Sequence, residues 1–164
     1  MAAVTTLPAA FTVGQVLTST QMNNLRGAFR VLQVVQATFA TSTASTSTSF
    51  VTSGLNASIT PSSNTSKILV MTTMPARTEN TSGGIVCTIF RGTVAGTNLL
   101  TTEGFGRVSG ANDLQANLCM NYLDSPATTS ATTYTIGFKS TAAQNAVCQV
   151  NNATSSITLL EISA

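Results

Sequence analysis

The chain has 164 residues, of which 43% are hydrophobic, and its only charged side chains are seven Lys or Arg and five Asp or Glu. With 30 Thr and 18 Ser, hydroxyl groups take the place of charges on its polar surface, and it has no His. The apolar content excludes a disordered polar tract, and the length fits one domain plus a short appendage. Because the basic residues are spread singly and the net charge is only +2, we expect no nucleic-acid partner.

The first thirty residues differ from the rest of the chain. Residues 11–17 have the pattern of an extended lead-in. Thr18 and Gln21 then form a capping box, and Leu17 and Met22 occupy the two positions of a hydrophobic staple. The sequence therefore predicts that a short helix follows.

This helix would carry one narrow apolar stripe, because Met22, Leu25 and Phe29 are spaced at i, i+3 and i+7. Either the stripe docks on the chain's own domain, or the whole arm packs on a neighbouring subunit. We favour the second alternative, since so short a segment buries too little area to hold itself. The predicted partner-docking residues are Phe11, Val13, Val16, Leu17, Met22, Leu25 and Phe29. The predicted parts are an arm, residues 1–30, and a β domain, residues 31–164.

From Val31 onward the hydrophobic pattern has a period of two, which predicts strands. The continuous apolar run within residues 67–74 is typical of a strand that is buried on both faces. Residues 41–49 form a Ser/Thr-rich turn or edge segment. The predicted strands are residues 31–39, 55–60, 67–74, 85–91, 98–101, 114–122, 133–139, 146–151 and 156–162.

This pattern predicts an all-β fold. About eight to ten short strands with turn signals at roughly ten-residue spacing, and a helix only at the start, indicate an antiparallel β-sandwich of jelly-roll or related Greek-key type. A barrel is the alternative. The order in which the strands connect does not follow from periodicity.

The three cysteines do not form a metal site, because they lie about thirty residues apart and have no His or CxxC partner. We expect free thiols in strands. Cys119 falls on the polar face of its strand, whereas Cys148 aligns with Ala146 and Val150. If one thiol reacts, it should be Cys119.

The catalytic inventory is small. Without His, most hydrolase triads and nearly all zinc chemistry are excluded. A glycosidase needs a pair of carboxylates, but the available ones lie in loop-like stretches or flank a strand, and Asp124 before Ser125 and Pro126 is typical of a turn-forming residue. We therefore predict that the protein is not an enzyme and holds no cofactor and no metal. The five carboxylates are Glu79, Glu103, Asp113, Asp124 and Glu161.

Nothing in the sequence predicts export or membrane insertion. Residues 1–10 lack the positive start of a signal peptide, and no stretch approaches the ~20 apolar residues of a membrane helix. We expect synthesis in a reducing cytosol and no membrane insertion.

Several segments resemble known structural proteins of tailed bacteriophages. Residues 11–24, Phe-Thr-Val-Gly-Gln-Val-Leu-Thr-Ser-Thr-Gln-Met-Asn-Asn, resemble the lead-in at the start of many virion structural and tail-fibre proteins. Residues 31–36, 59–70, 123–128 and 157–162 look like a small β domain that recurs in cyanophage-type structural proteins. The resemblance implies a trimeric or otherwise oligomeric β module of the virion, assembled in the host cytoplasm and attached to other virion proteins through its N-terminus.

Two virion roles agree with this resemblance. In a tail-fibre appendage, which the lead-in favours, the arm would anchor the module to tail subunits and the loops would meet a host surface glycan. Sugar sites favour aromatic platforms, however, and the chain has 5% aromatics and no Trp. In a capsid cement (decoration) protein, the arm would clamp coat subunits, and the absence of shaft repeats from the sequence agrees with that role.

Overall fold

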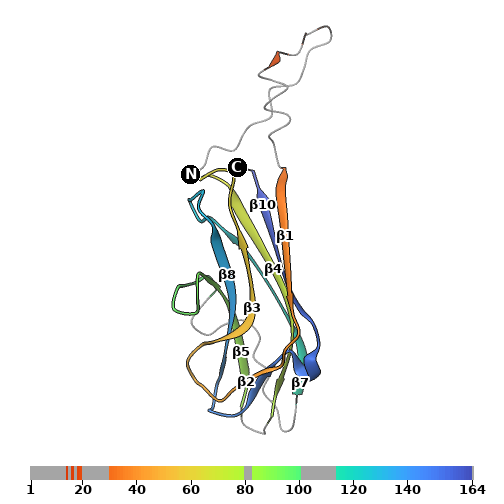
Figure 1. Cartoon of the computed structure of the whole chain (residues 1–164), viewed down its shortest axis with the longest axis vertical. Helices are drawn as coiled ribbons and strands as arrows, with labels where there is room; N and C mark the ends of the chain where they lie inside the picture. The colour runs from red at the N-terminus through yellow and green to blue at the C-terminus, as the bar shows by residue number, and fades with distance from the viewer. Residues whose placement is uncertain are drawn as a thin grey trace.

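The chain folds as an all-β sandwich of two antiparallel sheets, seen in a computed structural model that describes Gly14, Val16, Thr18, Ser19 and residues 30–79, 83–100 and 114–163 (Figure 1). The strands are β1 Val31–Phe39, β2 Thr43–Ser45, β3 Val51–Ile59, β4 Lys67–Thr78, β5 Ile85–Arg91, β6 Thr97–Asn98, β7 Leu114–Asp124, β8 Thr132–Ser140, β9 Ala146–Cys148 and β10 Ser155–Ile162. A 3₁₀ turn, η1 Val150–Asn152, separates β9 from β10. Of the predicted arm helix only Thr18 and Ser19 are described, so that helix stays a prediction.

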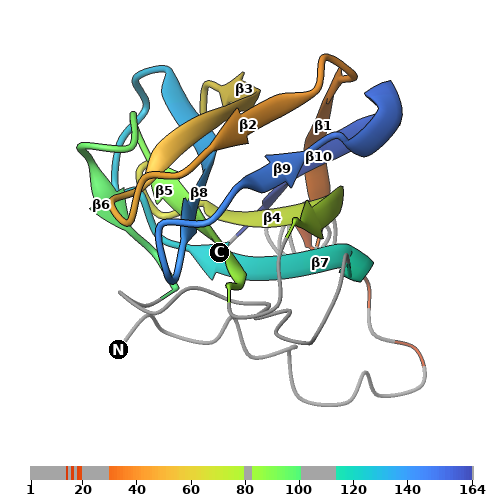
Figure 2. The same ribbon diagram turned by 90° about the horizontal axis from the view of Figure 1, so that it is seen from below.

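The strand order is that of a jelly roll. β10 and β9 pair with β4 one after the other, and β1 and β2 pair with β10 and β9 in the same way. If each of these pairs is taken as one interrupted strand, the first sheet has the order β1/β2, β9/β10, β4, β7, and the second sheet has the order β3, β8, β5, β6 (Figure 2). This is the eight-stranded arrangement of two Greek keys. The predicted jelly-roll-like sandwich is confirmed.

The interruption of β9/β10 explains how a proline fits in the middle of a sheet. Gln149 and Asn151 adopt left-handed backbone angles, φ 51° and 55°, and the side-chain oxygen of Asn152 accepts a hydrogen bond from the amide of Ser42, at 3.1 Å. Pro75 lies at the level of this break, where β4 has no partner strand on that side. Because no ladder bond is needed there, β4 continues past its predicted end.

The core lies between the sheets and is built from alternate residues of each strand. The inward side chains are mostly large and aliphatic, as the period of two requires. The largest fully buried apolar side chains are Leu55, Ile59, Ile68, Met74, Ile85, Ile89, Tyr134, Ile136, Phe138, Ile157 and Leu159.

One close contact ties the first sheet to the second. The pairing of β3 with β8 shifts register between Thr52 and Asn56, and Gly54 in this bulge has φ +84°. The ring of Phe39 from β1 occupies the space that a side chain at Gly54 would need. Glycine is therefore required here both for its backbone angle and for its size.

The outer face of the second sheet is closed by the chain's own side chains. Phe50 and Phe90 pack edge to face with ring centroids 5.4 Å apart, and the ammonium of Lys139 lies 4.8 Å from the centre of the Phe50 ring. Gly137 leaves room for the Phe90 ring, which lies where a side chain of residue 137 would be. The apolar surface on this side is therefore largely covered within one chain.

Candidate functional site on the outer face of the first sheet

The opposite surface of the sandwich is uncovered, and its central part is uncharged. Thirteen side chains that point away from the core on the first sheet lie between the outward-pointing Lys67 and Arg77 of β4 and form what is called here the outer face: Val34, Gln36, Thr38, Leu69, Met71, Thr73, Asn117, Cys119, Asn121, Leu123, Ser156, Thr158 and Leu160. None of these thirteen residues is charged. Lys67 marks one end, where its ammonium donates a hydrogen bond to the hydroxyl of Ser125, at 2.6 Å.

Strand register gathers apolar side chains into one line across this face. Val34 stands opposite Leu160, Leu160 opposite Leu69, and Leu69 opposite Leu123. These four residues, here called the apolar row, cross three strand spacings of about 4.8 Å, or about 14 Å in all. Val34 and Leu123 are 59% and 53% exposed. Apolar side chains that line up in this way are typical of a protein interface.

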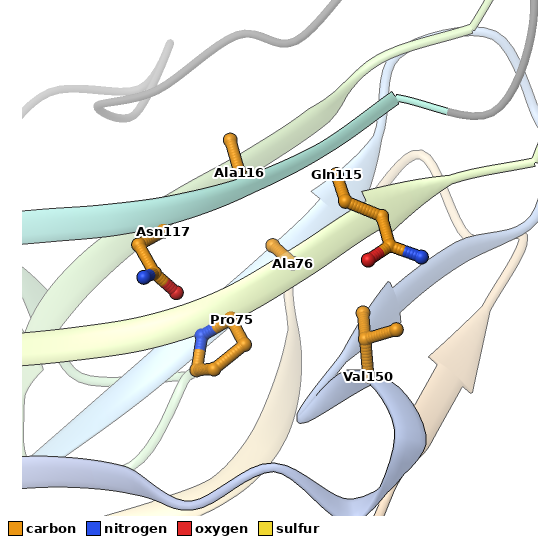
Figure 3. A pocket seen from close by; sticks show the side chains of 6 residues that line it. All are labelled: Pro75, Ala76, Gln115, Ala116, Asn117 and Val150. Carbon is orange, nitrogen blue, oxygen red and sulfur yellow. The ribbon is translucent and has the colours of Figure 1, made fainter.

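The first sheet has shallow hollows. One, about 470 Å³, adjoins the row and is lined by Met71, Thr72, Thr73, Cys119, Met120, Asn121, Ser156, Thr158 and Leu160. A second, about 230 Å³, lies where β7 passes β4 and η1, and is lined by Pro75, Ala76, Gln115, Ala116, Asn117 and Val150 (Figure 3). The residues that line these two hollows include no charged or aromatic side chain, so the hollows offer surface for contact and no acid or base for catalysis.

The prediction that residues 67–74 are buried on both faces is wrong for a single chain. Ile68 and Val70 are fully buried, but Met71, between them and the end of the run, is 47% exposed. In a two-layer sandwich the opposite sheet covers only one face of each strand. The second face of β4 is left open.

The described carboxylates are engaged in structural contacts, and Glu161 is the clearest case. Its side chain is fully buried and accepts hydrogen bonds from the amide and hydroxyl of Ser62, at 2.7 and 2.6 Å, and from the amide group of Gln33, at 2.6 Å. Burial acts to raise the pKa of Glu161, but these hydrogen bonds outweigh it and lower the pKa to about 2. Glu161 thus fastens the connection between β3 and β4 to the first sheet.

Asp124 does not have the predicted role of a turn-forming residue. It ends β7 with its side chain buried, accepts a hydrogen bond from the hydroxyl of Tyr134 at 2.7 Å, and forms an ion pair with Arg91 at 3.3 Å. Burial and the nearby Asp124 carboxylate raise the pKa of Tyr134 far above its ordinary value. Asp124 therefore does not form the predicted turn with its side chain. It points into the core and anchors the end of β7 there.

Asp124 and Glu161 are not arranged as a glycosidase pair. Both stand opposite Ile68, one on each side of β4, so two strand spacings, about 9.6 Å, separate their backbones. Both carboxylates lie inside the sandwich and are held by donors. Glu79 binds Arg77 and the amide of Asn145, while Glu103 and Asp113 lie outside the described residues. Within residues 30–79, 83–100 and 114–163 no group of three or more Cys, Asp or Glu side chains could hold a metal ion.

The cysteines lie where the alternation predicts. Cys119 is exposed on the outer face, and Cys148 is fully buried together with Cys87. Burial, and then the neighbouring Cys148, raise the pKa of Cys87 well above its ordinary value. Of the three thiols only Cys119 is open to reagents in solution.

The predicted docking residues of the arm are not tested by the structure. Val16 is 87% exposed, and Phe11, Val13, Leu17, Met22, Leu25 and Phe29 lie outside the described residues. The point of attachment is clear, however. The amide of Arg30 donates to the hydroxyl of Ser163 at 3.1 Å, and the amide of Ser163 donates to the carbonyl of Arg30 at 2.9 Å. The pairing of β1 with β10 thus extends to Arg30.

No known protein family matches the sequence, and no curated protein does. The chain is similar to chains of infectious bursal disease virus particles. It is 13% identical to a chain in the structure of the Gt strain, with a TM-score of 0.47, over 82% of this chain and 39% of that one. For the crystal structure of the T13 viral particle the values are 13%, 0.46, 84% and 37%, and for the derived T=1 particles they are 14%, 0.46, 80% and 36%.

This chain therefore spans less than two fifths of the length of those viral chains. Because the TM-scores are below 0.5, no property of those proteins is transferred to it. In the part of the chain that the structure describes, no helix is long and apolar enough to span a membrane.

Sequence reasoning did not find the apolar row. Val34, Leu69, Leu123 and Leu160 come from four strands, and only the register brings them into line. A signal was nevertheless present: β4 and β10 carry apolar residues at successive positions, where strict alternation would place polar ones on the outer face.

Proposed function

We propose that this protein is a non-enzymatic structural subunit of a virus particle that associates with copies of itself through the outer face. The observation that carries the proposal is the contrast between the two outer faces of the sandwich. Phe50 and Phe90 cover one within the chain, while the other leaves Val34, Met71 and Leu123 about half exposed in an uncharged area that only Lys67 and Arg77 of β4 flank. Depletion of charge around large apolar side chains is the compositional mark of an interface core.

The chemistry of the described residues supports a structural rather than a catalytic role. Glu161 and Asp124 are buried and hydrogen-bonded, and no acid or base lines the two larger hollows of the outer face. The jelly roll itself occurs in capsid and lectin domains alike, so the fold is compatible with this role without selecting it.

Within a virion, we propose a tail-fibre appendage, attached through the arm and assembled as a homotrimer. The phage-like lead-in of residues 11–24 supports this choice. Capsid cement is the second candidate, favoured by the compact sandwich of residues 31–163. A glycan-binding role gains no support, because the larger hollows of the outer face lack the aromatic platforms that sugars prefer.

Two measurements test the proposal. Sedimentation velocity of the full chain should give a trimer mass, and a monomer at every concentration would refute self-association. An antibody raised against residues 31–164 should label intact particles at the tail in electron micrographs. Label over the shell would instead make the protein capsid cement, and particles without any label would contradict a virion role.

A further inference from the structure

We propose that the outer face of one copy receives the N-terminal arm of a second copy, with the stripe of Met22, Leu25 and Phe29 lying across the apolar row. This inference deepens the proposed function, on which it rests, because it names the segment that covers the open face. The segment comes from the neighbouring chain and not from the chain whose face it covers.

The attachment point favours the arm of a neighbour over the chain's own arm. Arg30 is already paired with Ser163 in the extension of the β1–β10 ladder, which fixes the residue next to Phe29 at the end of the sheet. The predicted helix runs up to Phe29. Connections between a helix and a strand that fold back on each other usually take about two to six residues. No residues remain for a reversal that would bring the stripe onto the chain's own row.

The end of the sheet at which the arm leaves is also the end at which the apolar row lies. Val34 is four residues beyond Arg30, or about 13 Å along the strand. The arm of one copy can therefore meet the row of a second copy that is shifted along the strand direction, toward the arm, by about this distance. This arrangement needs no reversal of the chain at Arg30.

The stripe and the row match in length and in chemistry. From Met22 to Phe29 a helix rises about 10 Å, and the row spans about 14 Å. Residues 11–29 include a single charged residue, Arg26, and the thirteen residues of the outer face include none, with Lys67 beside the row at the end of β4. The three apolar side chains of the stripe can therefore lie along the row without burying an unpaired charge between them.

The sequence of β4 gives independent support. Its apolar run is typical of a strand buried on both faces, yet a single chain buries only the face with Ile68 and Val70. An arm supplied by a second copy would cover Leu69 and Met71 and complete the burial that the run predicts. On the other sheet, Phe50 and Phe90 of the same chain already cover the apolar surface.

Cross-linking between copies tests the source of the arm. The full chain is prepared with Cys119→Ser, leaving only the buried thiols Cys87 and Cys148. One tagged preparation also carries Leu25→Cys, and a second, untagged preparation carries Leu123→Cys. After mixing, a short bismaleimide should join the two preparations. With Leu114→Cys as the matched control, 43% exposed at the far end of the same strand, the yield should be at least about tenfold lower.

Charged substitutions in the apolar row test how much the row contributes to association between copies. Val34→Asp with Leu123→Asp should weaken association of the full chain by at least about tenfold, as loss of an interface hot spot does. Both positions are more than half exposed, so the fold should survive, and the circular dichroism spectrum checks that. Leu114→Asp should leave association unchanged.

The other outcomes overturn the inference in distinguishable ways. A cross-link that forms only within one chain carrying both Leu25→Cys and Leu123→Cys would mean that each arm covers its own sheet. Association that is unchanged by the charges at positions 34 and 123 would mean that another surface is used, and would overturn both the docking of the arm and the outer face as the self-association surface, leaving only the structural role in a virion. A full chain that stays monomeric would overturn both.

Discussion

At the scale of single residues, Glu161 makes stability depend on pH in a definite direction. Its pKa is about 2 in the folded chain, against about 4.3 in an unfolded one. A depressed pKa stabilises the fold above pH 4.3, and the stabilisation, on the order of 2 to 3 kcal/mol, is lost as the pH falls toward 2. Urea unfolding between pH 7 and pH 2 should reveal this loss.

The variant Glu161→Gln should remove the effect. It should be less stable than the parent at pH 7, because the donors of Ser62 lose a charged acceptor, and the two proteins should converge near pH 2. Glu79→Gln is the control, since Glu79 is 34% exposed and an ion pair at that position contributes little. Equal slopes of stability against pH for the parent and Glu161→Gln would contradict the assignment.

The cysteines give a second test at this scale. A maleimide should modify the folded protein once, at Cys119, and should reach Cys87 and Cys148 only in denaturant, because both are fully buried. Mass spectrometry counts the adducts. Cys119→Ser should abolish labelling of the folded protein, and rapid labelling of that variant would show that the core opens more readily than its burial indicates.

Residue placement could be predicted from sequence only where alternation alone decides it. The exposure of Cys119 and the burial of Cys148 follow from the period of two and are confirmed. The inward anchors could not be predicted in the same way. The donors of Glu161 come from Ser62, about a hundred positions away, and the partner of Asp124 is Tyr134, so both sites depend on tertiary contacts.

At the scale of elements, alanine substitutions at Gly54 and Gly92 test how the bulge in β3 contributes to stability. Gly54→Ala should destabilise the fold by about 2 to 4 kcal/mol, since it adds a clash with the Phe39 ring to the cost of a positive φ. Gly92→Ala, at φ +91° with an ordinary van der Waals distance of 3.9 Å to the Cα of Gly96, should cost about 1 kcal/mol. Chemical denaturation measures both, and equal losses would mean that the Phe39 ring yields.

The strands themselves were largely predictable. β1 and β5 have their predicted bounds, because their apolar residues alternate or run together between clear turn signals. β4 was predicted over residues 67–74, the extent of its apolar run. It continues to Thr78 because β9/β10 is interrupted at that level by left-handed Gln149 and Asn151. A break in a partner strand cannot be deduced from the strand that it affects.

At the scale of the whole molecule, the division into arm and sandwich can be tested by truncation. Deleting residues 1–30 should leave a folded β domain, because the core that the structure describes is built from side chains between Val35 and Leu159. The truncated chain should unfold cooperatively and no longer join the particle. Calorimetry and a pull-down with intact particles measure these outcomes, and loss of folding would mean that the arm is part of the core.

The fold class was predictable at this scale, but the topology was not. The period of two tells which face of a strand is buried and says nothing of which strand lies beside it. The jelly-roll order follows from pairings such as Val34 with Leu160, which join residues more than a hundred positions apart. For the same reason the open outer face could not be predicted, although the run in β4 indicated that it would need a cover.

The hydrogen bonds between Arg30 and Ser163 place the entry and the exit of the sandwich at a single point. A domain with adjoining ends can be spliced into a surface loop of another protein, or permuted by linking those ends, with a small loss of loop entropy. The sandwich could thus be carried as an insert as readily as at the end of a tether.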